Sequence, residues 1–133
     1  MRLLLLALAF VPLPGFHSPS GNIRCFVAPG GNLLCSVSHA DYATALQARC
    51  MGPGGAGVDW HGWQLRGAGK GGVSCSGGIL YNPSTQRPTY VNLPYGRSWR
   101  KGPFTCVSRL TGVTCTNTRG HGLFISRGSW RAW

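Results

Sequence analysis

Six cysteines in a chain of 133 residues set the framework into which this protein has to fold. Five of them end the same local pattern, with turn-forming residues three and four places before the cysteine and an apolar residue two places before it. Side chains two apart on a strand share a face, so each apolar residue should enter the same core as its sulfur. The pattern predicts five units in which a turn leads into a strand. The apolar residues are Ile23, Leu33, Val73, Phe104 and Val113.

The N-terminal residues indicate that these thiols are oxidised. Met1 and Arg2 precede an apolar run over 3–11 that stops at Pro12. This is typical of a secretory signal peptide, which we predict over 1–15, and the run is too short to span a bilayer. We therefore expect one domain over 16–133, secreted or extracytoplasmic, monomeric and without a transmembrane segment in the mature chain. In an oxidising compartment the cysteines of a small domain form disulfides.

The spacing of the cysteines predicts how they pair. Two pairs flank short segments that fold back as hairpins, one of them about Gly30, and this sets the two sulfurs of each pair opposite each other. The remaining two cysteines then form the third pair. By loop entropy, each disulfide contributes about 2.5 to 3.5 kcal/mol. The predicted pairs are Cys25–Cys35, Cys106–Cys115 and Cys50–Cys75.

The rest of the chain predicts a mainly β fold with one short helix. Good helix formers are confined to 40–49, and Ser38 followed by Asp41 resembles a capping box, so we interpret Asp41 as a first-turn acid. The glycine-rich stretch 67–72 matches a dinucleotide-binding pattern by letter but leads into a strand, which excludes that function. A linker is expected over 82–88. Strands are predicted at 60–65, 93–99, 104–108, 113–117, 123–127 and 130–133.

These elements predict a small disulfide-stapled antiparallel β domain, with sandwich and barrel both open.

The charge balance excludes several chemistries. There are 13 Lys and Arg against 2 Asp and no Glu, a formal net charge of +11. Glycoside hydrolysis and calcium binding need more carboxylates than Asp41 and Asp59 can supply. The cysteines and histidines lack metal-ligand spacing. We therefore predict no metal, no cofactor and no catalytic residue.

The histidines are the only side chains that titrate near neutrality. His17 and His39 are expected to be solvent-exposed, whereas His61 and His121 are the better candidates for a functional role.

Cationic and aromatic side chains interleave in the C-terminal third, as they do on surfaces that bind polyanions. The alternative is that Tyr95 and Trp99 pack in the core while the arginines solvate its outside. The candidate binding residues are Tyr95, Arg97, Trp99, Arg100, Lys101, Arg119, His121 and Arg127.

Several segments together resemble a known family. They are Phe16 to Cys25 with its S-P-S-G-N-I-x-C motif, 93–99, 102–106, the G-V-T-C-x-N motif at 112–117, and 120–127 with its G-H-G motif. Their order resembles a family of small exported proteins of unknown function from high-GC Gram-positive bacteria. The resemblance implies a secreted, disulfide-stapled single domain and carries no activity or catalytic residues.

These features favour a non-enzymatic binding or interaction domain at the cell envelope. Its partners would be anionic envelope polymers or an unknown protein, with nucleic acid bound only non-specifically. One alternative is a small secreted ribonuclease-like hydrolase, which would need two imidazoles at one phosphate. Another is an exported inhibitor or antimicrobial effector.

Overall fold

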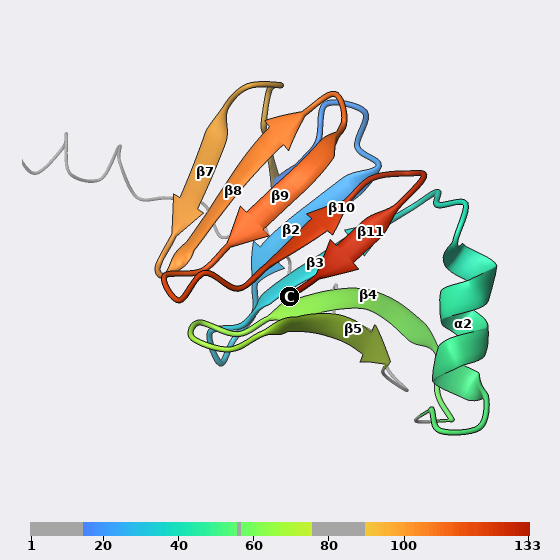
Figure 1. The fold of residues 1–133 in the computed structure, drawn as a ribbon. Helices are drawn as coiled ribbons and strands as arrows, with labels where there is room; N and C mark the ends of the chain where they lie inside the picture. The colour runs from blue at the N-terminus through green and yellow to red at the C-terminus, as the bar shows by residue number, and fades with distance from the viewer. Residues whose placement is uncertain (1–14, 56, 76–89) are drawn as a thin grey trace, which may run out of the picture.

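A computed structural model describes residues 15–55, 57–75 and 90–133. The expected signal peptide up to residue 14 and the linker at 82–88 lie outside the described residues. The described chain forms two sheets and one helix, α2 (Ala43–Met51), as Figure 1 shows. The first sheet contains β1 (Gly15–His17), β2 (Ile23–Val27), β3 (Leu33–Val37), β4 (Trp60–Leu65), β5 (Gly71–Cys75) and β6 (Tyr90–Asn92). The second contains β7 (Ser98–Lys101), β8 (Phe104–Arg109), β9 (Gly112–Thr116), β10 (Gly122–Ile125) and β11 (Trp130–Ala132).

The mainly β prediction with one short helix is confirmed. The first sheet has the order β5-β4-β3-β2-β1-β6 and the second β11-β10-β9-β8-β7. All neighbouring strands are antiparallel except β1 and β6, which are parallel. The strand expected at 93–99 begins only at Ser98, because the chain turns at Gly96, whose φ is +83° and whose N–H donates to the Ser108 carbonyl at 2.7 Å.

The three predicted disulfides are present. Two join directly opposite residues of hairpins: Cys25 faces Cys35 with a Cα separation of 4.1 Å, and Cys106 faces Cys115 at 4.0 Å. The Sγ atoms of Cys25, Cys35 and Cys115 lie within 4.8 Å of one another, so the hairpin disulfides of the two sheets meet in the core. The third disulfide joins Cys50 of α2 to Cys75 of β5, with a Cα separation of 5.5 Å.

The apolar residues that precede the cysteines enter the core, as predicted. Ile23, Leu33, Phe104 and Val113 are at most 5% exposed, and Val73 is half-buried against them. Both sheets contribute to this one core, and a hydrogen bond from the Gly71 N–H to the Trp133 carbonyl, at 2.9 Å, joins an edge of the first sheet to the C-terminal end of the second.

The predicted capping box is wrong. The helix begins at Ala43, its N-cap position is Tyr42, and no side chain caps it. Asp41 precedes the helix because its N–H donates to the Arg127 carbonyl at 2.9 Å, which fixes this backbone against the turn between β10 and β11. Asp41 therefore belongs to a contact between the segment that joins β3 to α2 and the turn that joins β10 to β11, rather than to the first turn of the helix.

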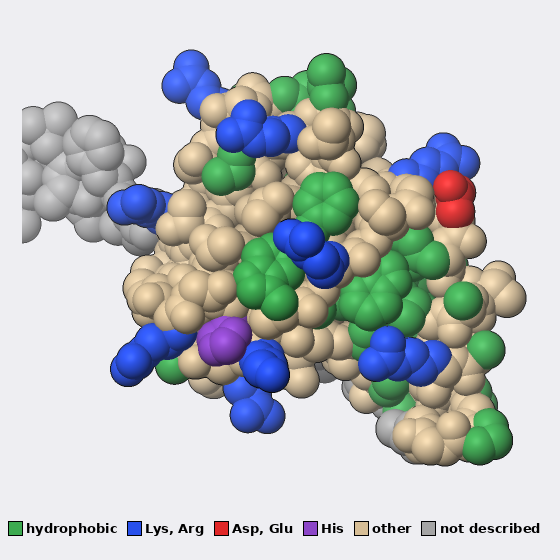
Figure 2. Space-filling model, viewed as in Figure 1, with side chains coloured by type: hydrophobic (Ala, Val, Ile, Leu, Met, Phe, Trp, Pro, Cys, Tyr) green, Lys and Arg blue, Asp and Glu red, His purple; other side chains and the backbone are tan. Residues whose placement is uncertain are grey.

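Basic side chains are distributed over the surface. Figure 2 shows Lys and Arg scattered across the face that carries β7 to β11, with acidic atoms only at its margin. No helix in the described ranges is long and apolar enough to cross a membrane.

Candidate functional site

A hollow of about 530 Å³ opens at one end of the two sheets, and we call it the groove. It is formed where five connecting segments converge: the turn between β1 and β2, the segment after β3, and the turns that precede β7, β9 and β11. Ile23 and Val113 contribute apolar surface from the core. Hydroxyl groups line much of the remainder, from Ser18, Ser20, Ser38 and Ser126.

One rim of the groove is fixed by Asn22. Its side-chain N–H donates to the His39 carbonyl at 3.1 Å, and its side-chain oxygen accepts the His39 N–H at 2.8 Å. This pair of bonds closes the turn between β1 and β2 onto the segment that follows β3. The backbone on that side is therefore positioned before any ligand arrives.

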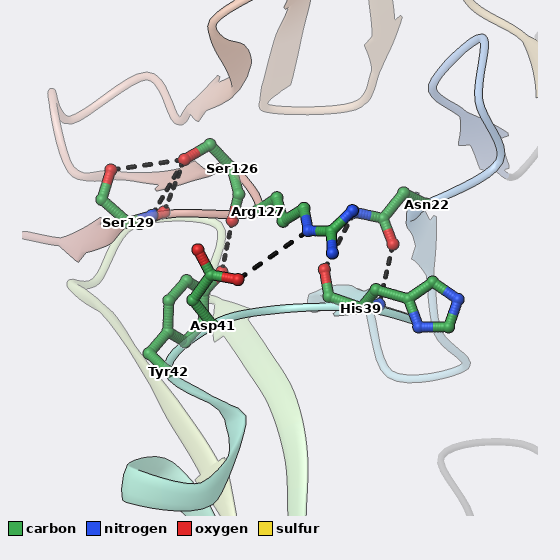
Figure 3. A network of polar contacts seen from close by, with 7 residues as sticks. All are labelled: Asn22, His39, Asp41, Tyr42, Ser126, Arg127 and Ser129. Carbon is green, nitrogen blue, oxygen red and sulfur yellow. Dashed lines mark hydrogen bonds and ion pairs between the residues drawn. The ribbon is translucent and has the colours of Figure 1, made fainter.

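The opposite rim is fixed by contacts between the segment that precedes α2 and the turn that joins β10 to β11, which Figure 3 shows together with the Asn22 pair. The Tyr42 hydroxyl donates to the Ser126 carbonyl at 2.6 Å, next to the bond from the Asp41 N–H to the Arg127 carbonyl. Burial, reinforced by the Asp41 charge, raises the pKa of Tyr42 to about 12, so the phenol stays a hydrogen-bond donor at ordinary pH. In Figure 3 the Arg127 side chain extends from this rim toward Asn22 and His39.

Three exposed arginines give the groove its positive charge, and the exposed His39 also lines it; the arginines are Arg24, Arg109 and Arg127. No carboxylate is among the described lining residues. Asp41 lies beside it, with its Oδ1 3.8 Å from Arg127 Nε, but these side chains are 71% and 73% exposed and solvent screens the pair. The groove therefore keeps a positive potential that favours anions.

The predicted binding residues do not form one site. Tyr95, 47% exposed, and Arg127 both line the groove, and Arg97 is exposed on the turn that carries Tyr95. Trp99 is 7% exposed, and its ring centroid lies 5.1 Å from that of Phe16 in the core. Trp99 therefore packs in the core, which is the alternative to a binding role that the sequence left open.

Two of the remaining candidates lie at the opposite end of the second sheet. Arg119, which is exposed, and His121, which is half-buried, follow β9, whereas the turn at the start of β9 lines the groove. Asn117 organises this end: its side-chain N–H groups donate to the Arg66 and Gly69 carbonyls, both at 2.9 Å.

The last two candidates lie on β7. Arg100 is exposed and pairs with Thr105, and Lys101 is half-buried and pairs with Phe104 at the turn into β8.

The two histidines that the sequence favoured are also separated. His61 is at the start of β4, whereas His121 follows Asn117, which bonds to the residue just after the end of β4. Near His61 in the sequence, the Asp59 carboxylate accepts a hydrogen bond from the Gln47 side chain at 2.8 Å. His17, expected to be exposed, is half-buried and donates from Nδ1 to the Ser18 carbonyl at 2.7 Å.

Sequence reasoning did not select Arg24, Arg109 or His39 for the groove. Arg24 lies within β2, Arg109 ends β8 and His39 lies two residues after β3, so these residues are far apart in the sequence and only the tertiary fold brings them together. Comparison with protein-family models, with curated proteins and with solved structures finds no match to this chain, so the family resemblance stays a prediction.

Proposed function

We propose that this protein is a non-enzymatic binding domain for anionic polymers of the cell envelope, and that the groove is its binding site. The observation that carries the proposal is the convergence of Arg24, Arg109, Arg127 and His39 on a hollow whose described lining contains no carboxylate. Guanidinium groups bind phosphate and carboxylate with two parallel hydrogen bonds, so this set of donors suits an anionic ligand.

The fixed rims support binding with little reorganisation. The Asn22 pair with His39 holds one side, and the bonds of Asp41 and Tyr42 hold the other. A site that is ordered beforehand loses less conformational entropy when its ligand binds. The exposed hydroxyls of Ser20 and Ser38 can then donate to the oxygen atoms of the ligand that the arginines leave unpaired, whereas the Ser126 hydroxyl already donates to the Ser129 carbonyl at 3.0 Å.

An extracytoplasmic location is part of the proposal. Three disulfides are compatible with it, because disulfides persist in oxidising compartments and are rare where thiols are kept reduced. A partner at the envelope would then meet the domain directly.

The arrangement of the histidines favours binding over acid–base cleavage of RNA. Such cleavage needs an acid and a base within reach of the same phosphate. Among the described residues, His39 is the one histidine that lines the groove. His121 lies at the other end of the second sheet, so these two imidazoles cannot act on the same phosphate.

The test measures binding of linear polyphosphate to the oxidised protein by calorimetry at physiological salt. Arg109→Ala removes a groove arginine, and Arg119→Ala removes an exposed arginine from the opposite end with the same change of net charge. We expect the first variant to bind five- to tenfold more weakly and the second to bind within twofold of the wild type, because an arginine–phosphate contact contributes about 1 to 1.4 kcal/mol at an exposed site.

Two results would contradict the proposal. Equal weakening by both variants would mean that the charge acts only as a diffuse field. Cleavage of end-labelled RNA by the wild type, lost in a histidine variant, would mean that the protein is an enzyme.

A further inference from the structure

The outer face of the second sheet carries a surface that adjoins the groove at the turn between β8 and β9. Alternation along the strands turns Leu123, Ile125, Cys106 and Cys115 into the core, so their neighbours point outward. In Figure 2 this side of the molecule shows hydrophobic groups with Lys and Arg groups between them. The outward residues that the strand register places in two rows are Arg131, Phe124, Thr114, Val107 and Ser98 in one, and Trp133, Gly122, Thr116, Thr105 and Arg100 in the other.

Two aromatic rings of this face lie directly over glycines. A methyl group added to Gly112 would lie 2.9 Å from both Cε1 and Cζ of Phe124. A methyl group added to Gly122 would lie 2.7 Å from Cζ2 of Trp133. Because neither glycine has a side chain, the two rings can pack directly against the backbone of the sheet.

Arg131 is held above the second ring. Its Cζ lies 4.7 Å from the centroid of the Trp133 ring, and the indole N–H is bonded to the Gly120 carbonyl at 3.0 Å, which fixes that ring. A guanidinium stacked on an aromatic face keeps its in-plane N–H donors free for a carboxylate. Arg131 is therefore a positioned anion receptor rather than a flexible surface cation.

Hydroxyl groups fill the middle of the face. Thr105, Thr114 and Thr116 are half-buried on neighbouring strands β8 and β9. Arg100 lies on β7 at the far edge, four strands from Arg131 on β11, which is about 19 Å at a spacing of about 4.8 Å per strand. The charges are therefore spaced for an extended chain that crosses the strands, not for one small anion.

We propose that this face binds a carboxylated polysaccharide laid across the strands of the second sheet. One sugar ring packs on Phe124, the threonines exchange hydrogen bonds with sugar hydroxyls, and carboxylates pair with Arg131 and Arg100. Single-stranded nucleic acid needs successive open aromatic faces for its bases. Here the Trp133 ring lies between Gly122 and Arg131, so Phe124 is the ring of this pair that a ligand can cover.

The inference rests on the proposed function in that the ligand is an anionic polymer, but it uses different residues. The experiment compares four probes by calorimetry at physiological salt: polygalacturonate, polyphosphate, poly(U) and uncharged dextran. Phe124→Leu keeps an apolar side chain over Gly112 without the flat ring. Arg131→Lys keeps the positive charge without the planar guanidinium that stacks on Trp133. Arg127→Ala, in the groove, is the matched control, because the Arg127 side chain extends toward Asn22 and His39, away from this face. Circular dichroism checks that each variant is folded.

We expect Phe124→Leu and Arg131→Lys each to weaken polygalacturonate binding at least fivefold and to leave polyphosphate binding within twofold, with the reverse pattern in Arg127→Ala. Unchanged polygalacturonate binding in both face variants overturns the inference. If poly(U) binds more tightly than polygalacturonate and loses affinity in Phe124→Leu, the face binds nucleic acid and the inference is wrong. If polygalacturonate binding depends on Arg127 alone, the inference fails while the proposed function stands. If the wild type binds none of the charged probes, both fail.

Discussion

Asn117 is one buried side chain that connects two turns far apart in the sequence. Its amide donates to the Arg66 and Gly69 carbonyls, and its side-chain oxygen accepts the N–H groups of Arg119 and His121 at 2.9 and 3.2 Å. Asn117 is 7% exposed, so a partner left unpaired there would be poorly solvated.

Replacing this residue should therefore cost more than replacing an exposed asparagine with the same kind of bonds. We expect Asn117→Ala to lower the free energy of unfolding by about 2 kcal/mol, since buried polar groups lose their partners. Asn22→Ala, whose two bonds to His39 are exposed to solvent, should cost about 1 kcal/mol. Urea denaturation at neutral pH measures both. Equal losses would show that water replaces the Asn117 bonds without penalty.

Tyr42 should give the stability a dependence on alkaline pH. The folded state raises its pKa from 10.0 to about 12, chiefly by burial, so the folded protein holds this proton more tightly than the unfolded chain does. The corresponding stability is fully present below pH 10 and is lost as the pH rises toward 12. Without solvent screening, the rise of the pKa from 10.0 to about 12 would correspond to about 3 kcal/mol of stability. Because solvent screens this half-buried phenol, we expect about 1 kcal/mol.

The measurement is urea denaturation between pH 8 and pH 12 for the wild type and Tyr42→Phe. The wild type should lose stability above pH 10 more steeply than the variant, and Tyr95→Phe, at an exposed tyrosine, should follow the wild type. Parallel curves for all three proteins would show that Tyr42 is not the group that titrates.

Among the structural elements, the link between α2 and β5 is the most accessible of the three disulfides. β5 is an edge strand, and Cys75 is half-buried, whereas the four cysteines of the hairpin disulfides are at most 1% exposed. Thiol–disulfide exchange needs direct access of the attacking thiolate to a sulfur atom.

We therefore expect a low concentration of dithiothreitol, in native buffer, to reduce Cys50–Cys75 first. Alkylation followed by peptide mapping should find the label on these two residues before the other four. The same treatment in urea should label all six together, which controls for intrinsic reactivity. Early labelling of Cys106 or Cys115 in native buffer would contradict the expected order.

How much of each element could be predicted depends on how local its cause is. The hairpins around Cys25–Cys35 and Cys106–Cys115 were predictable, because two sulfurs opposite each other fix the register of the flanking strands. The pairing of β1 with β6 was not, because it joins residues such as Phe16 and Val91 that lie far apart and carry no local signal. The start of α2 was missed because the Asp41 backbone bonds to a turn near the C-terminus.

At the scale of the whole molecule, the candidate site was less predictable than the fold. The groove takes Arg24 from β2, Arg109 from β8 and Arg127 from the turn after β10, and these residues meet only when both sheets assemble. Clustering along the sequence instead selected Arg100 and Lys101, which lie on β7 outside the groove. Charge could be predicted from composition, but the place where it converges could not.

The salt dependence of polyphosphate binding separates a defined site from the field of the whole chain, whose formal net charge is +11. A single-stranded polyanion releases about 0.7 counterion for each phosphate neutralised, so three groove arginines predict a slope of about −2 for log K against log salt concentration. Arg109→Ala should reduce the slope by about 0.7, whereas Arg119→Ala should leave it unchanged. A much steeper slope, lowered equally by both variants, would mean that cations over the whole surface take part. Since both variants lose one positive charge, a difference between them can arise only from where that charge lies.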